Sequence, residues 1–486
     1  MNKRKSGILC LAALVLGAGT CAETAGLPGK DEVGQEEKTQ TEEKRPEMYG
    51  FPWIESRRSE NGSDPLESFI KHMPDQQYGD ARGQALAPVF AAQWDGYLPE
   101  SWYAGDLGKK PVVRDQGKFG TCWALTAASA MEAVLLPEEQ IEFSADHISL
   151  SNAFDADVNA GGDYIMLMAY LSGWQGPVTE AEDPYGDGYS PQGLSPAVHV
   201  QEVQILEDPD VSQLKKALFR YGAVQTSLYM DKSTTEPGSP YYNDGTDAYY
   251  YFGDKIQNHD ILILGWDDGY SRFNFREVPA RDGAFICQNT WGDDFGEDGI
   301  FYVSYEDANI GAVSVLYSRI DPADNYSRIY QADDCGWQGN QGYDDDTCWF
   351  ANVYTARAEE ERLAAVGLYA TAPGASCEIY AVTDFEDKAS FERRKYLQSA
   401  EMENIGYYTI DLEEPVELEA GEQFALVVKM TTPGVWNPVA VEYRADEYTQ
   451  NVTLEGKEGY LSQTGEYWQN TEEEFGTNVC LKGYTR

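Results

Sequence analysis

The first residue with reactive chemistry in a suggestive setting is Cys122. It lies where a glycine-bearing loop gives way to an apolar run from Trp123 to Leu135, which Pro137 ends. Such a run predicts a helix with Cys122 at its start. A thiol at a helix N-terminus meets the positive end of the helix dipole and unpaired N–H groups, which favour the nucleophilic thiolate. The alternative for an isolated cysteine is an inert buried side chain.

A thiolate nucleophile needs a base, and the chain has four histidines: His72, His147, His199 and His259. His259 leads directly into the apolar stretch Ile261–Gly265, which is typical of a buried strand. Asn289 follows 30 residues later (289 − 259), and its amide can accept the imidazole N–H and hold the ring in one tautomer. Gln116 can donate a side-chain N–H to a developing oxyanion, together with the Cys122 backbone N–H.

These residues stand in three short motifs: Gln116-Gly117…Gly120-Thr121-Cys122-Trp123-Ala124, Asn258-His259 and Asn289-Thr290-Trp291-Gly292. In sequence and in order, the three motifs resemble those of the papain-like cysteine peptidases, and the resemblance covers about Leu98 to Val303. It implies that Cys122 is the nucleophile, His259 the general acid and base, Asn289 the residue that orients the imidazole, and Gln116 part of the oxyanion hole. Trp291 would shield the histidine–asparagine hydrogen bond from water.

The glycine pair Gly161-Gly162 looks like the pair whose backbone receives an extended substrate in that family. Glycines without Cβ atoms allow another chain to approach closely, although an ordinary turn is the alternative. The chain departs from many family members at Phe119, where they carry a bridging cysteine. The long interval between His259 and Asn289 predicts an enlarged hairpin through Asp267–Asp282.

The C-terminal part, with Trp349-Phe350-Ala351-Asn352 and Ala365-Val366-Gly367-Leu368-Tyr369, looks like the lectin-like β-sandwich that follows such peptidases in bacterial surface proteins, as in clostridial cell-surface cysteine peptidases. No cofactor is expected for catalysis. Several aspartates of this part could instead supply oxygen ligands to a structural calcium, or form a solvated acidic loop: Asp333, Asp334, Asp344, Asp345 and Asp346.

The composition narrows the class of partner. The 486 residues include 82 acidic and 36 basic ones, for a formal net charge of −46, and such a field repels nucleic acids and anionic membranes. Hydrophobic residues make up 42% and aromatic residues 13%, which is enough to build substantial cores and excludes wholesale disorder. Protein or peptide substrates are therefore the expected partners, with a cell-surface protein or glycan as a further partner of the C-terminal part.

The N-terminus predicts export. Three basic residues, Lys3 to Lys5, precede an apolar run from Ile8 to Leu16 and a small-residue exit, which is typical of a secretory signal cleaved after Ala22. The run is too short to be a transmembrane helix. Cys21 offers the alternative of a bacterial lipoprotein anchor. We expect an extracellular protein, secreted or associated with the cell surface.

The eight cysteines do not form a dense disulfide scaffold. Removal of residues 1–22 leaves Cys122, Cys287, Cys335, Cys348, Cys377 and Cys480 spread over a long chain without a CxxC pair, so a structural zinc site has no support. Bridges between Cys335 and Cys348, and between Cys377 and Cys480, are open alternatives that sequence cannot assign.

The elements that would position the site fall into four regions. Residues 1–22 are the signal, and residues 23–97 are an acidic tether with a connector or short pro-segment that contains at most one helix near Leu66–His72. Residues 98–321, with helices first and strands later, predict a two-lobed α+β domain. Residues 325–486, with short strands divided by turn residues, predict an antiparallel β-sandwich.

The expected function is that of a secreted cysteine endopeptidase acting through Cys122, His259 and Asn289 and an acyl-enzyme intermediate. One alternative is an exopeptidase of the same family, in which an insertion blocks one end of the cleft. The other is a surface adhesion or glycan-binding protein whose peptidase domain only processes its own N-terminal segment.

Overall fold

The computed structural model describes residues 47–50, 96–454 and 456–486. The predicted signal, the Cys21 anchor, most of the predicted tether and the helix near Leu66–His72 lie outside these residues. Glu47–Gly50 forms strand β1, whose backbone pairs with β12 (Gly339–Gly342). No helix in the described ranges is both long and apolar enough to cross a membrane.

The first lobe contains the helix that carries Cys122. The predicted helix is confirmed as α2, Cys122–Leu135, all of whose residues are buried. Two further helices pack near it, α3 (Ala145–Leu150) and α4 (Tyr164–Ser172), and each begins at a side-chain cap, Ser144 and Asp163. These caps accept backbone N–H groups that the first helical turn leaves unpaired.

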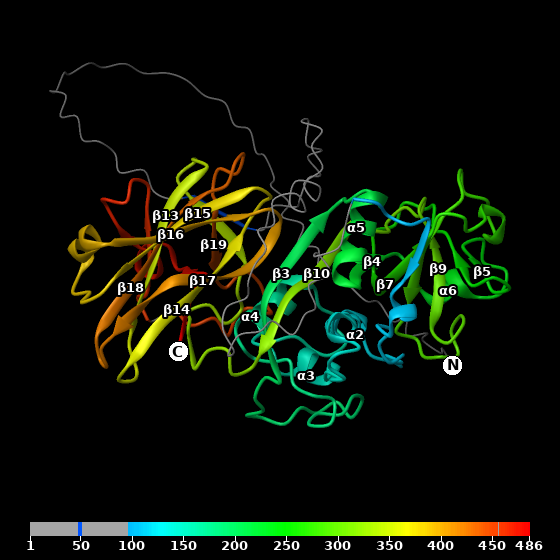
Figure 1. Cartoon of the computed structure of the whole chain (residues 1–486), viewed down its shortest axis with the longest axis horizontal. Coiled ribbons are helices and arrows are strands. Elements are labelled where there is room, and N and C mark those ends of the chain that lie inside the picture. Colours follow the sequence, from blue (N-terminus) through cyan, green and yellow to red (C-terminus); the bar gives the residue numbers. More distant parts are fainter. Residues whose placement is uncertain (1–46, 51–95, 455) are drawn as a thin grey trace, which may run out of the picture.

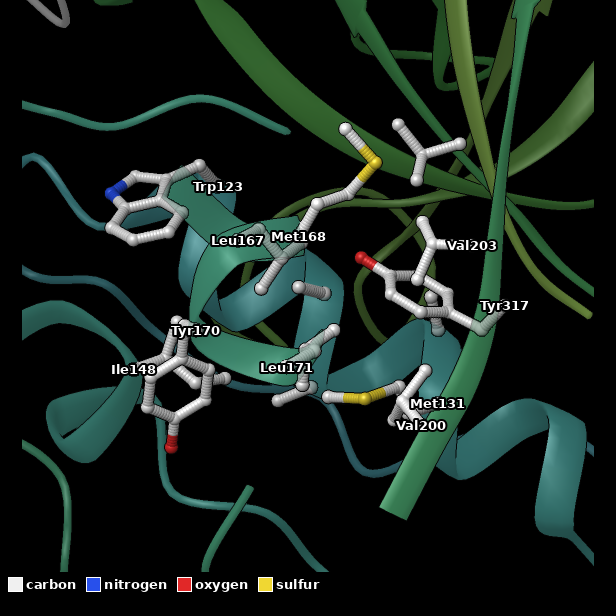
Figure 2. Close-up of a cluster of buried hydrophobic side chains, with 14 of the residues drawn as sticks. Trp123, Met131, Ile148, Leu167, Met168, Tyr170, Leu171, Val200, Val203 and Tyr317 are labelled. Atoms are coloured by element: carbon white, nitrogen blue, oxygen red, sulfur yellow. The ribbon is translucent and has the colours of Figure 1, made fainter. Parts of the chain in front are cut away.

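The core of this lobe joins its helices to the neighbouring sheet (Figure 2). Met131 of α2 and Leu167 and Leu171 of α4 pack in one cluster with Val203 of strand β3 (Val198–Glu207) and Tyr317 of strand β10 (Val313–Pro322). Because α2 is buried all round, its N-terminus and Cys122 are fixed relative to that sheet.

The second lobe is built on antiparallel strands in the order β10-β4-β7-β8-β9, and the stretch Ile261–Gly265, predicted as a strand, lies within β7. Helix α5 packs on this sheet, while a short 3-10 helix lies in the long hairpin between β7 and β8. The bounds in this lobe are β2 Ser101–Tyr103, η2 Ala104–Leu107, α5 Val211–Tyr221, β4 Val224–Leu228, α6 Lys232–Thr235, β5 Tyr242–Asn243, β6 Ala248–Tyr249, β7 His259–Asp267, η3 Arg272–Asn274, β8 Ala284–Gln288 and β9 Ile300–Ser304.

The C-terminal part is an antiparallel β-sandwich, as predicted. One sheet has the order β16-β15-β18-β13-β20-β21, and the strands β11-β23-β14-β17 face it across a core that includes Leu363, Ile379, Leu426 and Leu481. The bounds are β11 Arg328–Tyr330, β13 Thr347–Thr355, β14 Glu361–Ala370, β15 Ala375–Val382, η4 Lys388–Arg393, β16 Lys395–Met402, β17 Ile405–Leu418, β18 Gln423–Thr431, β19 Val439–Glu442, β20 Gly459–Ser462, β21 Gln469–Asn470, α7 Thr471–Phe475, β22 Asn478–Val479 and β23 Leu481–Thr485.

A single sheet runs through both parts of the molecule. Strand β17 of the sandwich pairs with β3 through Ile405–Ile205 to Tyr408–Glu202, which makes one sheet of 13 strands (Figure 1). The hydrophobic cluster beneath α2 also includes Tyr369 and Tyr407 of the sandwich. The sandwich therefore buttresses the first lobe through shared backbone hydrogen bonds and a shared core.

The six cysteines of the described residues are all buried thiols. Neither bridge considered from the sequence forms. Cys348 donates to the Ser462 carbonyl, whereas Cys335 donates to the Ala153 carbonyl. Four of these cysteines, Cys287, Cys348, Cys377 and Cys480, belong to hydrophobic cores, where burial raises the pKa of the Cys377 thiol to about 12.

Candidate active site

Cys122 and His259 line one cavity of about 100 Å³, and they reach it from opposite lobes. Cys122 is the first residue of α2, and His259 is the first residue of β7. Their side chains are nearly covered, with 4% and 3% of their surfaces exposed. A thiol at a helix N-terminus and an imidazole at the same cavity are the two groups that nucleophilic thiol catalysis requires.

The His259 imidazole is held by Asn289. Its Nε2 lies 2.7 Å from Asn289 Oδ1, and the Thr290 backbone N–H donates to the same oxygen at 2.8 Å. Since Oδ1 can only accept, Nε2 carries the hydrogen and donates it. The remaining ring nitrogen, Nδ1, is then the one available to exchange a proton with a thiol.

Trp291 covers this pair. Its ring centroid lies 4.9 Å from that of His259, with the two planes tilted by 39°. Asn289 itself is 1% exposed. A hydrogen bond shielded from water in this way is stronger than one at the surface. Trp291 does not line the cavity.

Gln116 lies in a network with the Asn289 loop rather than on the cavity wall. Its Oε1 accepts hydrogen bonds from Thr290 Oγ1 at 2.7 Å and Trp291 Nε1 at 3.2 Å, and its Nε2 donates to the Phe119 carbonyl at 2.9 Å. These contacts fix which end of the amide carries the hydrogens. Gln116 does not line the cavity.

The two loops that carry these side chains are tied together by their backbones. Gln116 N–H donates to the Thr290 carbonyl at 2.8 Å, and Gly292 N–H donates to the Arg114 carbonyl at 3.1 Å. The loop before the thiol is thereby fixed to the loop that orients the imidazole. This pairing of the two loops could not be predicted from local sequence, because the partners lie more than 170 residues apart.

The glycine pair lines the same cavity, and the structure adds a reason for each glycine. Gly161 has a φ of +82°, which other residues rarely adopt. A Cβ on Gly162 would lie 2.3 Å from the Trp123 ring. Glycine is thus required at position 162 by packing against the residue that follows Cys122, which the sequence pattern does not reveal.

Sequence reasoning missed the polar wall of the cavity. Asp260, Gln225 and Ser227 line it together with Cys122 and His259. The signal that could have located Asp260 is its place directly after His259. The two others lie on β4, whose pairing with β7 cannot be read from local sequence.

The candidate calcium ligands of the C-terminal part do not gather in one place. The buried Asp333 carboxylate pairs with Lys482 Nζ at 2.6 Å, and Asp345 accepts the Thr347 backbone N–H at 3.1 Å. In the described part of the chain, no three His, Cys, Asp or Glu side chains are grouped so that they could hold a metal ion.

The buried imidazole makes the stability of the fold depend on pH. Burial lowers the pKa of His259 to about 4 from its usual 6.5, although the Asn289 hydrogen bond opposes the shift. Above pH 6.5 both folded and unfolded chains hold a neutral imidazole. Between pH 6.5 and 4 only the unfolded chain takes up the proton, so stability is lost as pH falls through this window.

We expect protonation of the His259 imidazole in the unfolded chain to lower the free energy of unfolding by about 2–3 kcal/mol when the pH falls from 7 to 4.5. Urea unfolding of the wild type and of His259→Gln at both pH values measures it. The variant, which has no group titrating there, should lose correspondingly less stability on acidification. Equal losses in the two proteins would show that His259 is not held neutral by burial.

Comparison with known proteins identifies both parts of the chain. Residues 98–318 match the family model described as papain family cysteine protease, and residues 329–485 match the lectin like domain. Cathepsin K of Mus musculus is 21% identical over 245 residues, which are 49% of this chain and 69% of the mouse enzyme. Cysteine proteinase 1 of Zea mays is 27% identical over 233 residues, or 45% of this chain and 58% of the maize enzyme.

The fold is also similar to a solved two-domain structure. The cysteine protease and lectin-like domains of Cwp84, a surface layer associated protein of Clostridium difficile, superpose with a TM-score of 0.68 at 22% identity, covering 91% of this chain and 98% of that one. At this identity the likeness concerns the fold. The family models show that residues 98–318 form a papain-family cysteine protease domain, which is a hydrolase domain, and that residues 329–485 form a C-terminal lectin-like domain.

Proposed function

We propose that the chain is an exported cysteine endopeptidase in which Cys122, His259 and Asn289 form the catalytic triad. The observation that carries the proposal is the hydrogen bond between His259 Nε2 and Asn289 Oδ1 beside a cavity that Cys122 also lines. This bond leaves Nδ1 of the ring for the thiol. Export rests on the signal-like N-terminus, Lys3 to Ala22.

The proposed reaction proceeds in two steps. Nδ1 of His259 takes the Cys122 proton, and the thiolate sulfur attacks the peptide carbonyl carbon. As the C–N bond breaks, the imidazolium returns that proton to the leaving amine, which leaves an acyl-enzyme. In the second step His259 removes a proton from water, the hydroxide attacks the thioester, and the thiol is regenerated with release of the acid.

The oxyanion formed in each step needs N–H donors. The Cys122 backbone N–H, at the N-terminus of α2, is one proposed donor, and Gln116 Nε2 is the other. Gln116 Nε2 gives one hydrogen to the Phe119 carbonyl and has a second to offer. The Gly161-Gly162 backbone is proposed to receive the extended substrate. The mechanism requires no cofactor.

The lectin-like domain is proposed to keep the protease domain near its substrates at a cell surface by contacting a protein or a glycan. The support is the family match of residues 329–485 and the shared sheet, which fixes this domain against the first lobe. A structural calcium in this domain has no support from the placement of Asp333, whose carboxylate is committed to Lys482.

End-blocked peptides test the endopeptidase assignment. We expect the full chain to cleave internally quenched peptides that are acetylated and amidated at their termini about as fast as peptides with free termini. Mass spectrometry of the products should show internal cleavage. Hydrolysis confined to peptides with a free terminus would identify an exopeptidase, and a single cut in the chain's own residues 47–97 without turnover of added peptide would identify a self-processing protein.

A further inference from the structure

The cavity beside Cys122 has a wall made by three neighbouring strands. In the antiparallel register Val315 of β10 lies opposite Gln225 of β4, and Ser227 of β4 lies opposite Asp260 of β7. All four line the cavity. Residues at directly opposed positions project from the same face of a sheet. The wall therefore combines an apolar side chain with a carboxylate and its polar neighbours.

A chain of hydrogen bonds sets the role of the Asp260 carboxyl group. Tyr317 Oη donates to Gln225 Oε1 at 2.6 Å, so the other end of this amide must donate, and Gln225 Nε2 does so to Asp260 Oδ2 at 2.7 Å. Ser227 Oγ donates to Asp260 Oδ1 at 2.5 Å. Both carboxyl oxygens are acceptors, which is the arrangement that suits an anionic carboxylate.

Among the residues that the structure describes, no lysine or arginine lies beside this carboxylate in the cavity. The lining contains Asp163 as a second acid but no lysine or arginine. Asp163 already accepts the backbone N–H groups of Ile165 and Met166 as the cap of α4. Burial raises the pKa of Asp260, and the Asp163 charge adds to the effect. Asp260 is partly buried, and an anion without a countercharge in such a place is costly, so a cation that pairs with it in the cavity is favoured.

The rest of the lining suits the stem of a long basic side chain. Val313 and Val315 of β10 line the same cavity and supply apolar surface, and Tyr164 also lines it. Lysine and arginine bury their methylene stems against such surface while their charged ends meet a polar group. Glutamate and aspartate would instead bring a second negative charge beside Asp260.

We propose that Asp260 selects peptide substrates that carry a lysine or arginine close to the cleaved bond, with its cationic end paired to the carboxylate held by Gln225 and Ser227. This inference rests on the proposed peptidase function, which supplies the peptide in the cavity. It makes Asp260 a specificity-determining residue, whereas the reacting groups remain Cys122 and His259.

The test compares peptides that differ only in charge at one position. Blocked, internally quenched peptides carry lysine, norleucine or glutamate at each of the three positions on either side of the cleaved bond, and kcat/KM is measured with the full chain. Norleucine keeps the stem of lysine and removes its charge. At one position we expect lysine to exceed norleucine by about 10- to 100-fold, with glutamate slowest, as for a close and partly desolvated charge pair.

Asp260→Asn removes the charge at nearly constant shape and should reduce the lysine-to-norleucine ratio to within about threefold of unity. Asp254→Asn is the matched control, because Asp254 is exposed and does not line the cavity, yet its loss changes the net charge equally. The control should keep the full ratio. If Asp260→Asn does not fold, Asp260→Ser repeats the test with a smaller side chain that can both donate and accept.

The ratio of kcat/KM for the lysine and norleucine peptides distinguishes a role of Asp260 in specificity from a role in the fold. If Asp260 only supported the fold, Asp260→Asn would slow the lysine and norleucine peptides by the same factor, and the inference would be overturned. A wild-type ratio near unity at every position overturns it as well, while the peptidase function stands.

A binding measurement tests the role of Asp260 even if the chain has no peptidase activity. Calorimetry with the Cys122→Ala variant and the same uncleaved peptides gives a ratio of Kd values without turnover. If the wild type cleaves none of the peptides, the peptidase proposal fails. Tighter binding of the lysine peptide by Cys122→Ala would then still support Asp260 as a residue that selects cationic side chains. Equal binding would overturn the inference.

Discussion

Replacing Cys122 by alanine is expected to lower kcat for peptide hydrolysis by about 10⁶-fold, to the background rate. The alanine has no group that can form the acyl-enzyme, and none of the other five described thiols lines the cavity. The fold should survive, since Cys122 occupies the first position of α2 and removal of one sulfur atom leaves the other buried residues of that helix in place. Initial rates on a blocked, quenched peptide measure the loss.

Cys287→Ala is the matched control for this loss. Cys287 is fully buried in β8, and burial raises the pKa of its thiol well above the usual value, so it cannot act as a thiolate. This variant should keep activity within a few fold of the wild type. A Cys122→Ala protein with wild-type activity, or a Cys287→Ala protein without activity but with normal folding, would contradict the assignment of the nucleophile.

His259→Ala is expected to cost about 10⁴- to 10⁶-fold in kcat, because it removes the group that takes the thiol proton and returns it to the leaving amine. Asn289→Ala keeps the imidazole but removes the acceptor 2.7 Å from Nε2, so its loss should lie between the wild type and His259→Ala. His147→Ala is the control, since that buried histidine bonds to the Tyr170 hydroxyl and does not line the cavity.

Comparing the activities of these three variants distinguishes a catalytic role of His259 from a role in folding. A loss of activity in His147→Ala as large as that in His259→Ala would mean that any buried histidine is needed for folding, and circular dichroism on the purified variants separates that case. Unchanged activity in His259→Ala would contradict the proposed acid–base role.

Local sequence predicted the elements that carry the candidate site. The apolar run after Cys122 forms α2, and the stretch after His259 forms β7, because each has the periodicity and end signals of its element. The strands of the C-terminal sandwich were predicted for the same reason. Strand β7 runs from His259 to Asp267, so it extends the predicted stretch Ile261–Gly265 by two residues at each end.

Long-range pairing was not accessible from the sequence. The contact between β3 and β17 joins residues about 200 positions apart, so the single sheet that unites the two parts could not be read from either segment alone. Strand β3 itself was not predicted, nor was the cross-strand network of Gln225 and Asp260. Such pairings depend on which faces meet in three dimensions rather than on local preference.

In the candidate site, too, the sequence predicted the residues that stand in motifs but not the contacts between distant segments. The resemblance to the papain-like family placed Cys122, His259 and the glycine pair at what proves to be one cavity. It did not reveal that Gln116 is tied to the Asn289 loop, that Trp123 excludes any side chain at position 162, or that Asp260 contributes a carboxylate to the wall. Those features depend on side-chain contacts that no single motif contains.

Covalent labelling tests the central claim most directly. The full chain is treated with a thiol-reactive epoxide peptide inhibitor, digested and mapped by mass spectrometry, in parallel with His259→Ala and Cys287→Ala. The account predicts one modified residue, Cys122, in the wild type and in Cys287→Ala, and a strongly reduced rate of modification in His259→Ala. Labelling at another thiol, or equally fast labelling of Cys122 without the imidazole, would contradict a thiol–imidazole pair at this site.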